Sequence, residues 1–483
     1  MLFNSFEFLV FLPIVFLLYW YVFKTRKWQN LLIVVSSYIF YGWWNCTFLI
    51  LIAFTSLCSF LCGLAIQHDI ENNVSHKGRF ATLNACINLL VLCVYKYYNF
   101  FADSLVEAFS VFHVNLHPVT LNLILPVGIS FYTFQALSYT IDVYRGKIQA
   151  TKDIVSFFAF LSFFPQLVAG PIERATNLLP QFQNKRVFDY SFAVEGCRQM
   201  LWGFFKKIVI ADNCAYYADI AFNNTSECGS VSLILGVLFF TFQIYGDFSG
   251  YSSIAIGCSK LFGISLCANF RVPYFSRDIA EFWRRWHISL NKWFVDYVYI
   301  PLGGSRVSKQ MVIRNIFVIF LLSGLWHGAN WTYVLWGGYH ACLFLPLILL
   351  GNNHRYTGGF SENLLPKRTE VLGMITTFAL VCLGWIIFRA DSMSSFVEYM
   401  KGIFSLRPNG SSWVSISDSL WLVVTILIML IIEWFNRNSA YELEVVPKNK
   451  ILRHLVYALL IGSTFMAYMM SIQDDNTFIY FQF

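Results

Sequence analysis

Histidines in apolar surroundings are the first candidates for chemistry in this sequence. The strongly apolar segment 315–345 contains His327 and His340, with Trp326 and Asn330 as supporting residues beside His327. An ionisable side chain at membrane depth is costly and is therefore a functional candidate. Because the pKa of a free imidazole is about 6.5, His327 could take the proton from a hydroxyl whose oxygen attacks an acyl carbonyl. A structural histidine, which donates one hydrogen bond and accepts another, is the alternative and is favoured for His340.

A second candidate is the segment 281–304, which is too polar to span a membrane and too aromatic for a solvated loop. Because tryptophan favours the membrane–water boundary, the pattern predicts an interfacial helix. Its basic side chains either anchor that helix at lipid headgroups or gather anionic groups of a substrate, such as the phosphates of coenzyme A. The strip contains Trp283, Trp286, Trp293, Arg284, Arg285, His287 and Lys292.

A third candidate is Asp247, in the segment QIYGDFSGYSSIAIG (243–257). This carboxylate could orient a histidine or an arginine, or it could cap a broken helix, and a structural role is favoured. A transporter or flippase would instead use His327 and Asp247 as proton-relay groups. From these residues alone, that class stays open.

The last six residues, FIYFQF, form an aromatic tail. Such an apolar tail would tend to aggregate if it were exposed to water. Its aromatic spacing therefore predicts that it packs into a groove. An interfacial aromatic anchor is favoured by the pattern alone. The alternative is that Tyr480 offers its phenol oxygen to chemistry.

The composition sets the environment in which these groups work. The 483 residues are 57% hydrophobic, 19% aromatic and 13% charged, whereas soluble domains carry about 25% charged residues. This balance excludes an ordinary soluble enzyme, a disordered chain and a nucleic-acid-binding domain. The twelve cysteines form no CxxC pair and lie mostly in apolar segments, so neither a disulfide framework nor a metal site is predicted.

Apolar runs predict about twelve spans, some of them re-entrant, in one membrane domain over 1–470 that is followed by a tail over 471–483. Gly and Pro interrupt several runs, for example at Pro126, Pro165 and Pro171, and irregular backbone is tolerated only inside protein or along a cavity. The runs lie near 6–23, 30–44, 47–66, 84–102, 120–140, 154–168, 231–247, 311–325, 331–350, 370–388, 418–434 and 452–470.

Basic clusters predict the orientation, because Lys and Arg favour cytoplasmic loops. The basic cluster at 24–27 follows the first run, and a second cluster at 448–454 precedes the last run. Asp474 and Asp475 follow that last run. Both chain ends are therefore expected outside the cytoplasm.

Six stretches together resemble the bacterial alginate O-acetyltransferase branch of the membrane-bound O-acyltransferase family. The branch commonly has an acidic residue where Ser253 stands, and often polar or charged residues where Ser265 and Ala268 stand, so no role is assigned to these three positions. From Leu125 to Ala341 the stretches are LPVGISFYTFQALSYTIDVYRG, FPQLVAGPIERATNLLPQF, GFFKKIVIADN, YGDFSGYSSIAIG, EFWRRWHISL with IPLGG, and LWHGANWTYVLWGGYH.

The resemblance implies an all-α integral membrane protein, with a ring of tilted and broken transmembrane helices around a central funnel or channel. It implies that His327 is the catalytic histidine, and that His287 is a second, near-invariant histidine on the cytoplasmic side of the same channel. The tail resembles a FxYxxF motif that ends a small partner protein in teichoic-acid D-alanylation systems. Phe478, Tyr480 and Phe483 occupy the motif positions.

The resulting hypothesis is an O-acyltransferase, an acetyltransferase, in a bacterial inner or cell membrane. Acetyl-CoA or another acyl thioester is the donor, and Arg284, Arg285 and Lys292 help to hold it, without a further cofactor or a metal. His327 acts as base towards Tyr480. A periplasmic or secreted acetyltransferase partner then passes the acetyl group to a polysaccharide acceptor.

Two alternatives remain beside that hypothesis. The first is direct O-acylation of a cell-wall hydroxyl without the tyrosine relay. The second is a proton-coupled transporter or flippase. Membrane lipid is an expected partner in each case, and nucleic acid is not.

Overall fold

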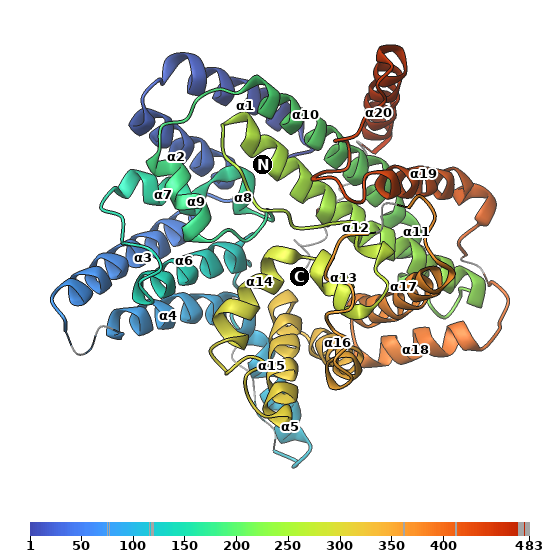
Figure 1. The fold of residues 1–483 in the computed structure, drawn as a ribbon. Helices are drawn as coiled ribbons and strands as arrows, with labels where there is room; N and C mark the ends of the chain where they lie inside the picture. Colours follow the sequence, from blue (N-terminus) through green and yellow to red (C-terminus); the bar gives the residue numbers. More distant parts are fainter. Residues whose placement is uncertain are drawn as a thin grey trace. The chain divides into compact units, whose positions relative to one another are not determined.

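The computed structural model describes residues 1–74, 76, 78–114, 116, 120–360, 363–410, 413–471 and 478. These residues form helices and connecting loops, with no strand among them (Figure 1). They divide into unit 1, which is Met1–Gly196 with Ala255–Cys267, and unit 2, which is Cys197–Ile254 with Ala268–Phe483. The predicted all-α class is confirmed, whereas the ring and funnel stay predictions.

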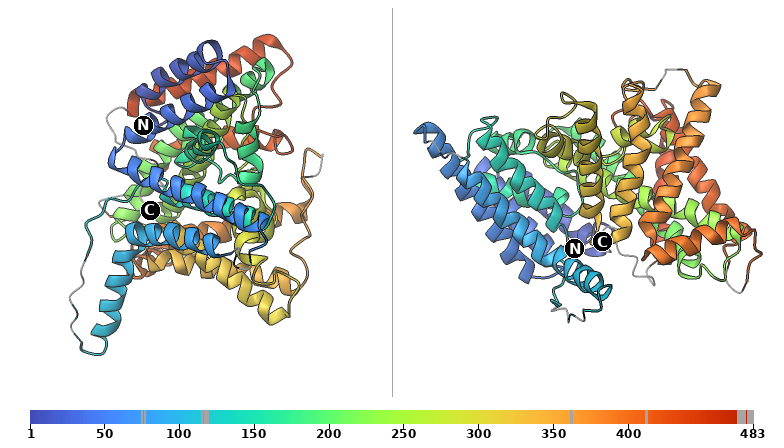
Figure 2. Two further views of the ribbon diagram at one scale, coloured as in Figure 1. Left: turned by 90° about the vertical axis from the view of Figure 1, so that its left-hand side faces the viewer. Right: turned by 90° about the horizontal axis from the view of Figure 1, so that it is seen from below.

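Unit 1 is built around α6 (Ile129–Tyr144), in which every residue except Ile141 and Tyr144 is buried. A helix that is buried on all sides must be enclosed by its neighbours, and α3 and α4 lie side by side against it (Figure 2). The other helices of this unit are α1 (Phe6–Leu17), η1 (Leu18–Val22), α2 (Arg26–Gly42), α3 (Thr47–Glu71), α4 (Arg79–Leu92), η2 (Cys93–Tyr97), α5 (Tyr98–Ser110), α7 (Ile154–Ser162), α8 (Phe164–Leu167), α9 (Ala175–Gln183) and the start of α10 (Tyr190–Phe204).

Unit 2 contains a long central helix, α12 (Ser230–Leu261), whose last residues belong to unit 1. Two very short helices, α13 and α14, follow it and carry much of the second predicted site. The remaining helices are η3 (Phe205–Ala211), α11 (Asp212–Asn223), η4 (Pro273–Phe275), α13 (Ile279–Arg285), α14 (Ile288–Phe294), η5 (Val295–Tyr299), α15 (Lys309–His327), α16 (Trp331–Leu349), α17 (Arg368–Arg389), α18 (Met393–Phe404), α19 (Ile416–Phe435) and α20 (Lys450–Ser471).

Eight helices among the described residues are long and apolar enough to cross a membrane, which makes this a multi-pass membrane protein. The predicted runs near 120–140 and 154–168 form shorter helices, α6 and α7. Pro126 precedes α6, and Pro165 is the second residue of α8, just after the break between α7 and α8, so both prolines lie where the helices are interrupted. Whether these segments are re-entrant stays a prediction. The eight helices are Thr47–Glu71, Arg79–Ser110, Ser230–Leu261, Lys309–His327, Trp331–Leu349, Arg368–Arg389, Ser417–Phe435 and Lys450–Met470.

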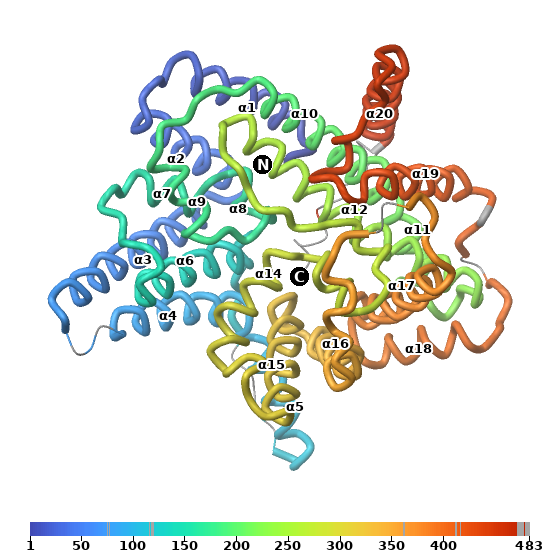
Figure 3. Tube along the Cα trace, viewed as in Figure 1, coloured from blue at the N-terminus to red at the C-terminus, as the bar shows by residue number. Residues whose placement is uncertain are grey.

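Two glycines allow α15 and α16 to pack backbone to backbone as a hairpin (Figure 3). A Cβ added at Gly324 would lie 2.1 Å from the carbonyl oxygen of Tyr333, and one added at Gly337 would lie 2.2 Å from that of Phe320. No larger residue fits at either position without separating the helices. This close contact fixes the end of α15, where His327 lies.

Candidate active site

His287 lies at the break between α13 and α14. Its backbone is left-handed (φ 44°, ψ 52°), a conformation that costs a non-glycine residue about 1–2 kcal/mol. The segment predicted to form an interfacial helix is therefore divided by this turn into two short helices, and its interfacial position stays a prediction. Trp283, Trp286 and Trp293 are buried in unit 2.

The imidazole of His287 is 1% exposed. Its Nδ1 lies 3.0 Å from Oδ1 of Asn269, and its ring packs edge-on against Phe248 at a centroid distance of 4.7 Å. Burial lowers the pKa of His287 to about 3, so the ring is neutral near physiological pH. A neutral imidazole has one nitrogen that donates and one that accepts.

His327 is the last residue of α15 and is 4% exposed. Its ring centroid lies 5.2 Å from that of Trp336 and 5.4 Å from that of Phe388. Trp326 contacts both histidine rings, at 5.0 Å from His327 and 5.7 Å from His287. Aromatic side chains thus surround the imidazole of His327 on several sides.

The two histidines are neighbours, with ring centroids 6.4 Å apart. Both belong to unit 2, although forty residues separate them in the sequence. A single oxygen atom can contact both rings across this gap, because a hydrogen bond spans about 3 Å. The structure therefore unites the two motifs that the sequence singled out separately.

Asp247 forms an ion pair with Lys207 of η3, at 2.9 Å. Lys207 also contacts Asp212 at 2.7 Å, and all three side chains are buried. Burial alone would lower the pKa of Lys207, but the two carboxylates outweigh it and raise this pKa above its ordinary value. Asp247 thus has a lysine partner that sequence reasoning missed, although Lys207 lies within the quoted stretch GFFKKIVIADN.

The predicted donor-binding residues separate into two groups. Arg284 donates to the backbone carbonyls of Asn353 and Tyr356, at 2.8 and 3.2 Å. Arg285 pairs with Glu281 at 2.9 Å, whereas Lys292 is exposed on α14. The two guanidinium groups therefore have protein partners, and Lys292 is the more accessible cation.

Asn330 is hydrogen-bonded to the backbone, whereas the ring of His340 is buried among other side chains. Asn330 caps α16 by accepting from the backbone N–H of Thr332 at 3.0 Å, and its amide donates to the carbonyl of Asp391. His340 is fully buried, and neither ring nitrogen has a hydrogen-bond partner within the described part of the chain. The expected donor-and-acceptor pair for His340 is thus not found there.

Of the last six residues the structure describes Phe478, which is 2% exposed. Its ring lies 4.7 Å from Tyr251 and 6.3 Å from Phe248 between centroids, and Phe248 itself contacts His287. Phe478 is therefore buried against the histidine site, as a tucked tail requires. Tyr480 and Phe483 lie outside the described residues.

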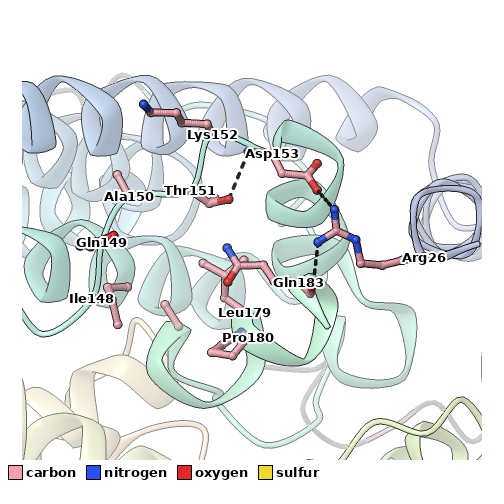
Figure 4. Close-up of a pocket in the computed structure, with 11 residues that line it drawn as sticks. Arg26, Ile148, Gln149, Ala150, Thr151, Lys152, Asp153, Leu179, Pro180 and Gln183 are labelled. Carbon is pink, nitrogen blue, oxygen red and sulfur yellow. Dashed lines mark hydrogen bonds and ion pairs between the residues drawn. The ribbon is translucent and has the colours of Figure 1, made fainter. Parts of the chain in front are cut away.

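A polar cleft of about 550 Å³ lies in unit 1. Arg26 lies at one side of the cleft and contacts Asp153 at 3.4 Å and the carbonyl of Gln183 (Figure 4). Lys152 also lines the cleft. None of the predicted site residues line it, and no group of histidine, cysteine or acidic side chains in the described ranges is arranged to hold a metal.

Comparisons with known proteins give one family match and several relatives. Residues 31–383 match the profile described as MBOAT, membrane-bound O-acyltransferase family. The chain is 39% identical over 446 residues to a probable alginate O-acetylase of Pseudomonas aeruginosa, covering 92% of this chain and 82% of the relative. It is 34% identical over 447 residues to a peptidoglycan O-acetyltransferase of Helicobacter pylori, covering 86% and 82%. It is 29% identical over 288 residues to a teichoic acid D-alanyltransferase of Bacillus subtilis, covering 57% and 71%.

Proposed function

Because this chain belongs to the membrane-bound O-acyltransferase family, we propose that it moves an acetyl group from a cytoplasmic thioester to a hydroxyl of an extracytoplasmic polysaccharide. The relatives are named for alginate, peptidoglycan and teichoic acid, which supports a polymer as the final acceptor. The observation that carries the proposal is the pair of buried imidazoles of His287 and His327, 6.4 Å apart inside a multi-pass membrane protein.

His327 acts as the general base, and the phenol of Tyr480 is the first acceptor. Its oxygen attacks the thioester carbonyl carbon as His327 takes the phenol proton; the carbon–oxygen bond forms, the carbon–sulfur bond breaks, and the thiolate recovers that proton. A phenol pKa near 10 against about 6.5 for imidazole makes a completed transfer before attack cost roughly 5 kcal/mol. The proton therefore moves during the attack.

The acyl-tyrosine is the relay of the proposal. A covalent intermediate divides one difficult transfer into two easier steps. Phe478 supports this assignment, because it lies against Phe248, whose ring contacts His287, and Tyr480 follows it by two residues in the sequence. In the second step, a periplasmic or secreted acetyltransferase passes the acetyl group from the tyrosine ester to the polymer hydroxyl.

Lys292 is the cation that we assign to the phosphates of the donor, acetyl-CoA or another acyl thioester. It is exposed on α14, and a charge-assisted contact to phosphate is strong. Arg284 and Arg285 contribute to donor binding indirectly. Arg284 holds the 353–356 loop in place, and Arg285 holds Glu281. In this proposal the donor end of α14 faces the cytoplasm and both chain ends lie outside, in a bacterial inner or cell membrane.

The test is transfer of radiolabel from acetyl-CoA to the purified full chain in nanodiscs. We expect label on the wild-type protein and none on His327→Ala or Tyr480→Phe. Label that survives Tyr480→Phe would contradict the relay. Label that passes to an added polymer hydroxyl without ever resting on the protein would favour direct transfer, with the tail as an anchor.

A further inference from the structure

Asn269 connects α12 to the segment that contains His287. Its amide donates from Nδ2 to Oγ of Ser252 on α12, at 3.1 Å. Its Oδ1 accepts from Oγ of Ser289 at 2.8 Å and from the backbone N–H of Ser289 at 3.3 Å. The same Oδ1 lies 3.0 Å from Nδ1 of His287, and Asn269 is 1% exposed.

These contacts determine which end of the Asn269 amide faces His287. A backbone N–H can only donate, so the amide end that faces the N–H of Ser289 must be the oxygen. That oxygen is also the atom beside Nδ1 of His287. Since a carbonyl oxygen can only accept, Nδ1 must carry the hydrogen, and the other nitrogen of a neutral ring, Nε2, has none.

The position of His287 is fixed by the backbone on both sides. Residues 269–271 pair with 285–288 through the N–H of Ile288 to the carbonyl of Asn269, at 2.9 Å, and the N–H of Arg271 to the carbonyl of Arg285, at 3.0 Å. The left-handed conformation of His287 is held by these bonds. Such an outlier persists only where its surroundings over-determine it, and it is often found at functional sites.

Nε2 of His287 is buried and has no hydrogen-bond partner among the described residues. A buried polar atom left without a partner is costly. The ring of His287 also lies beside that of His327, at a centroid distance of 6.4 Å. The site is therefore built to receive an N–H or O–H group of a bound reactant at this nitrogen.

We propose that Asn269 is a positioning residue that holds His287 in the Nδ1–H tautomer, so that Nε2 serves only as a hydrogen-bond acceptor for the bound reactants. His287 then cannot return a proton to the leaving thiolate. Both proton transfers of the reaction fall to His327, and His287 orients a reactant. This role in turnover rests on the proposed acyl transfer, whereas the tautomer is a property of the resting protein.

Nitrogen NMR of the full chain labelled with ¹⁵N-histidine, in nanodiscs, tests the tautomer directly. The chain has nine histidines, and the pair of signals that disappears in His287→Gln identifies this ring. We expect a protonated Nδ1 and an unprotonated Nε2 in the wild type. Asn269→Asp keeps an acceptor oxygen and should keep this pattern, whereas Asn269→Leu should give mainly Nε2–H or a mixture.

Asn84→Leu is the matched control, because Asn84 is another fully buried asparagine, hydrogen-bonded to Ser59 and Thr140 in unit 1. It should leave the His287 signals unchanged. For acyl transfer we expect Asn269→Leu to lower kcat by about 10- to 100-fold, as loss of a group that orients a histidine does elsewhere, with substantial recovery in Asn269→Asp.

An Nε2–H tautomer in the wild type, or an unchanged Nδ1–H pattern in Asn269→Leu, would overturn the proposal. Equal kcat for Asn269→Leu and the wild type would overturn the role of Asn269 in turnover. If the wild type shows the expected tautomer but transfers no acetyl group, the proposed function fails while the tautomer assignment stands.

Discussion

The contact between α15 and α16 should control the activity of His327. A Cβ added at Gly337 would lie 2.2 Å from the carbonyl oxygen of Phe320, whereas one added at the adjacent Gly338 would meet nothing closer than Leu321 Cδ2 at 3.7 Å. An ordinary contact is about 3.5 Å, so Gly337→Ala requires the two helices to separate by about 1 Å. Phe320 lies two turns before His327 on α15, so the displacement reaches the base.

A misplacement of about 1 Å can lower the rate about 100-fold, which is about 2.7 kcal/mol of activation free energy. We therefore expect kcat/KM for acyl transfer to fall by about that factor in Gly337→Ala. Gly338→Ala is the matched control, because both changes replace a glycine of α16 and both raise helix propensity by about 1 kcal/mol.

The assay compares initial rates of acetyl transfer for both variants in nanodiscs, together with their melting temperatures. Gly338→Ala should retain roughly the wild-type rate. Equal rates for two folded variants would refute the claim that this helix contact positions His327.

Three further predictions address other parts of the site. Lys207→Met leaves the carboxylate of Asp247 buried beside a second one, so the free energy of unfolding should fall by about 3–5 kcal/mol, and denaturation that matches the wild type would contradict the ion-pair account. Arg284→Ala should lower the melting temperature, because it releases the 353–356 loop. Lys292→Ala should instead raise KM for the thioester, with little change in melting temperature. The reverse pattern would assign donor binding to Arg284 and a structural role to Lys292. Burial lowers the pKa of His287 to about 3 in the folded protein, whereas it is about 6.5 in the unfolded chain. The neutral, buried His287 therefore contributes fully to stability above about pH 6.5, and this contribution is lost as the pH falls from about 6.5 towards 3. Melting temperatures of His287→Gln should therefore depend less on pH over this window, and parallel pH dependences would contradict the assignment.

Much of the site could be predicted from the sequence because its signals are local. A histidine within an apolar segment, as at His327, is a functional candidate by residue type alone, and prolines lie just before α6 and just after α7. The aromatic tail also suggested burial, which Phe478 shows.

The rest depends on contacts between distant segments. Asn269 has no unusual sequence surroundings, and its importance follows from a turn that brings it against His287 and Ser289. The turn itself needs a left-handed histidine, which residue type does not predict. Similarly, the three tryptophans of 281–304 resemble an interfacial belt in composition. The break in the helix, which the sequence does not predict, lets them point into the protein core.

Peptide mass spectrometry after a single turnover with acetyl-CoA tests the central claim most directly. The account predicts an acetyl ester on Tyr480 in the C-terminal peptide of the wild-type protein, and its absence in His327→Ala. An acetyl group on another residue, or undiminished acetylation of Tyr480 in His327→Ala, would contradict it.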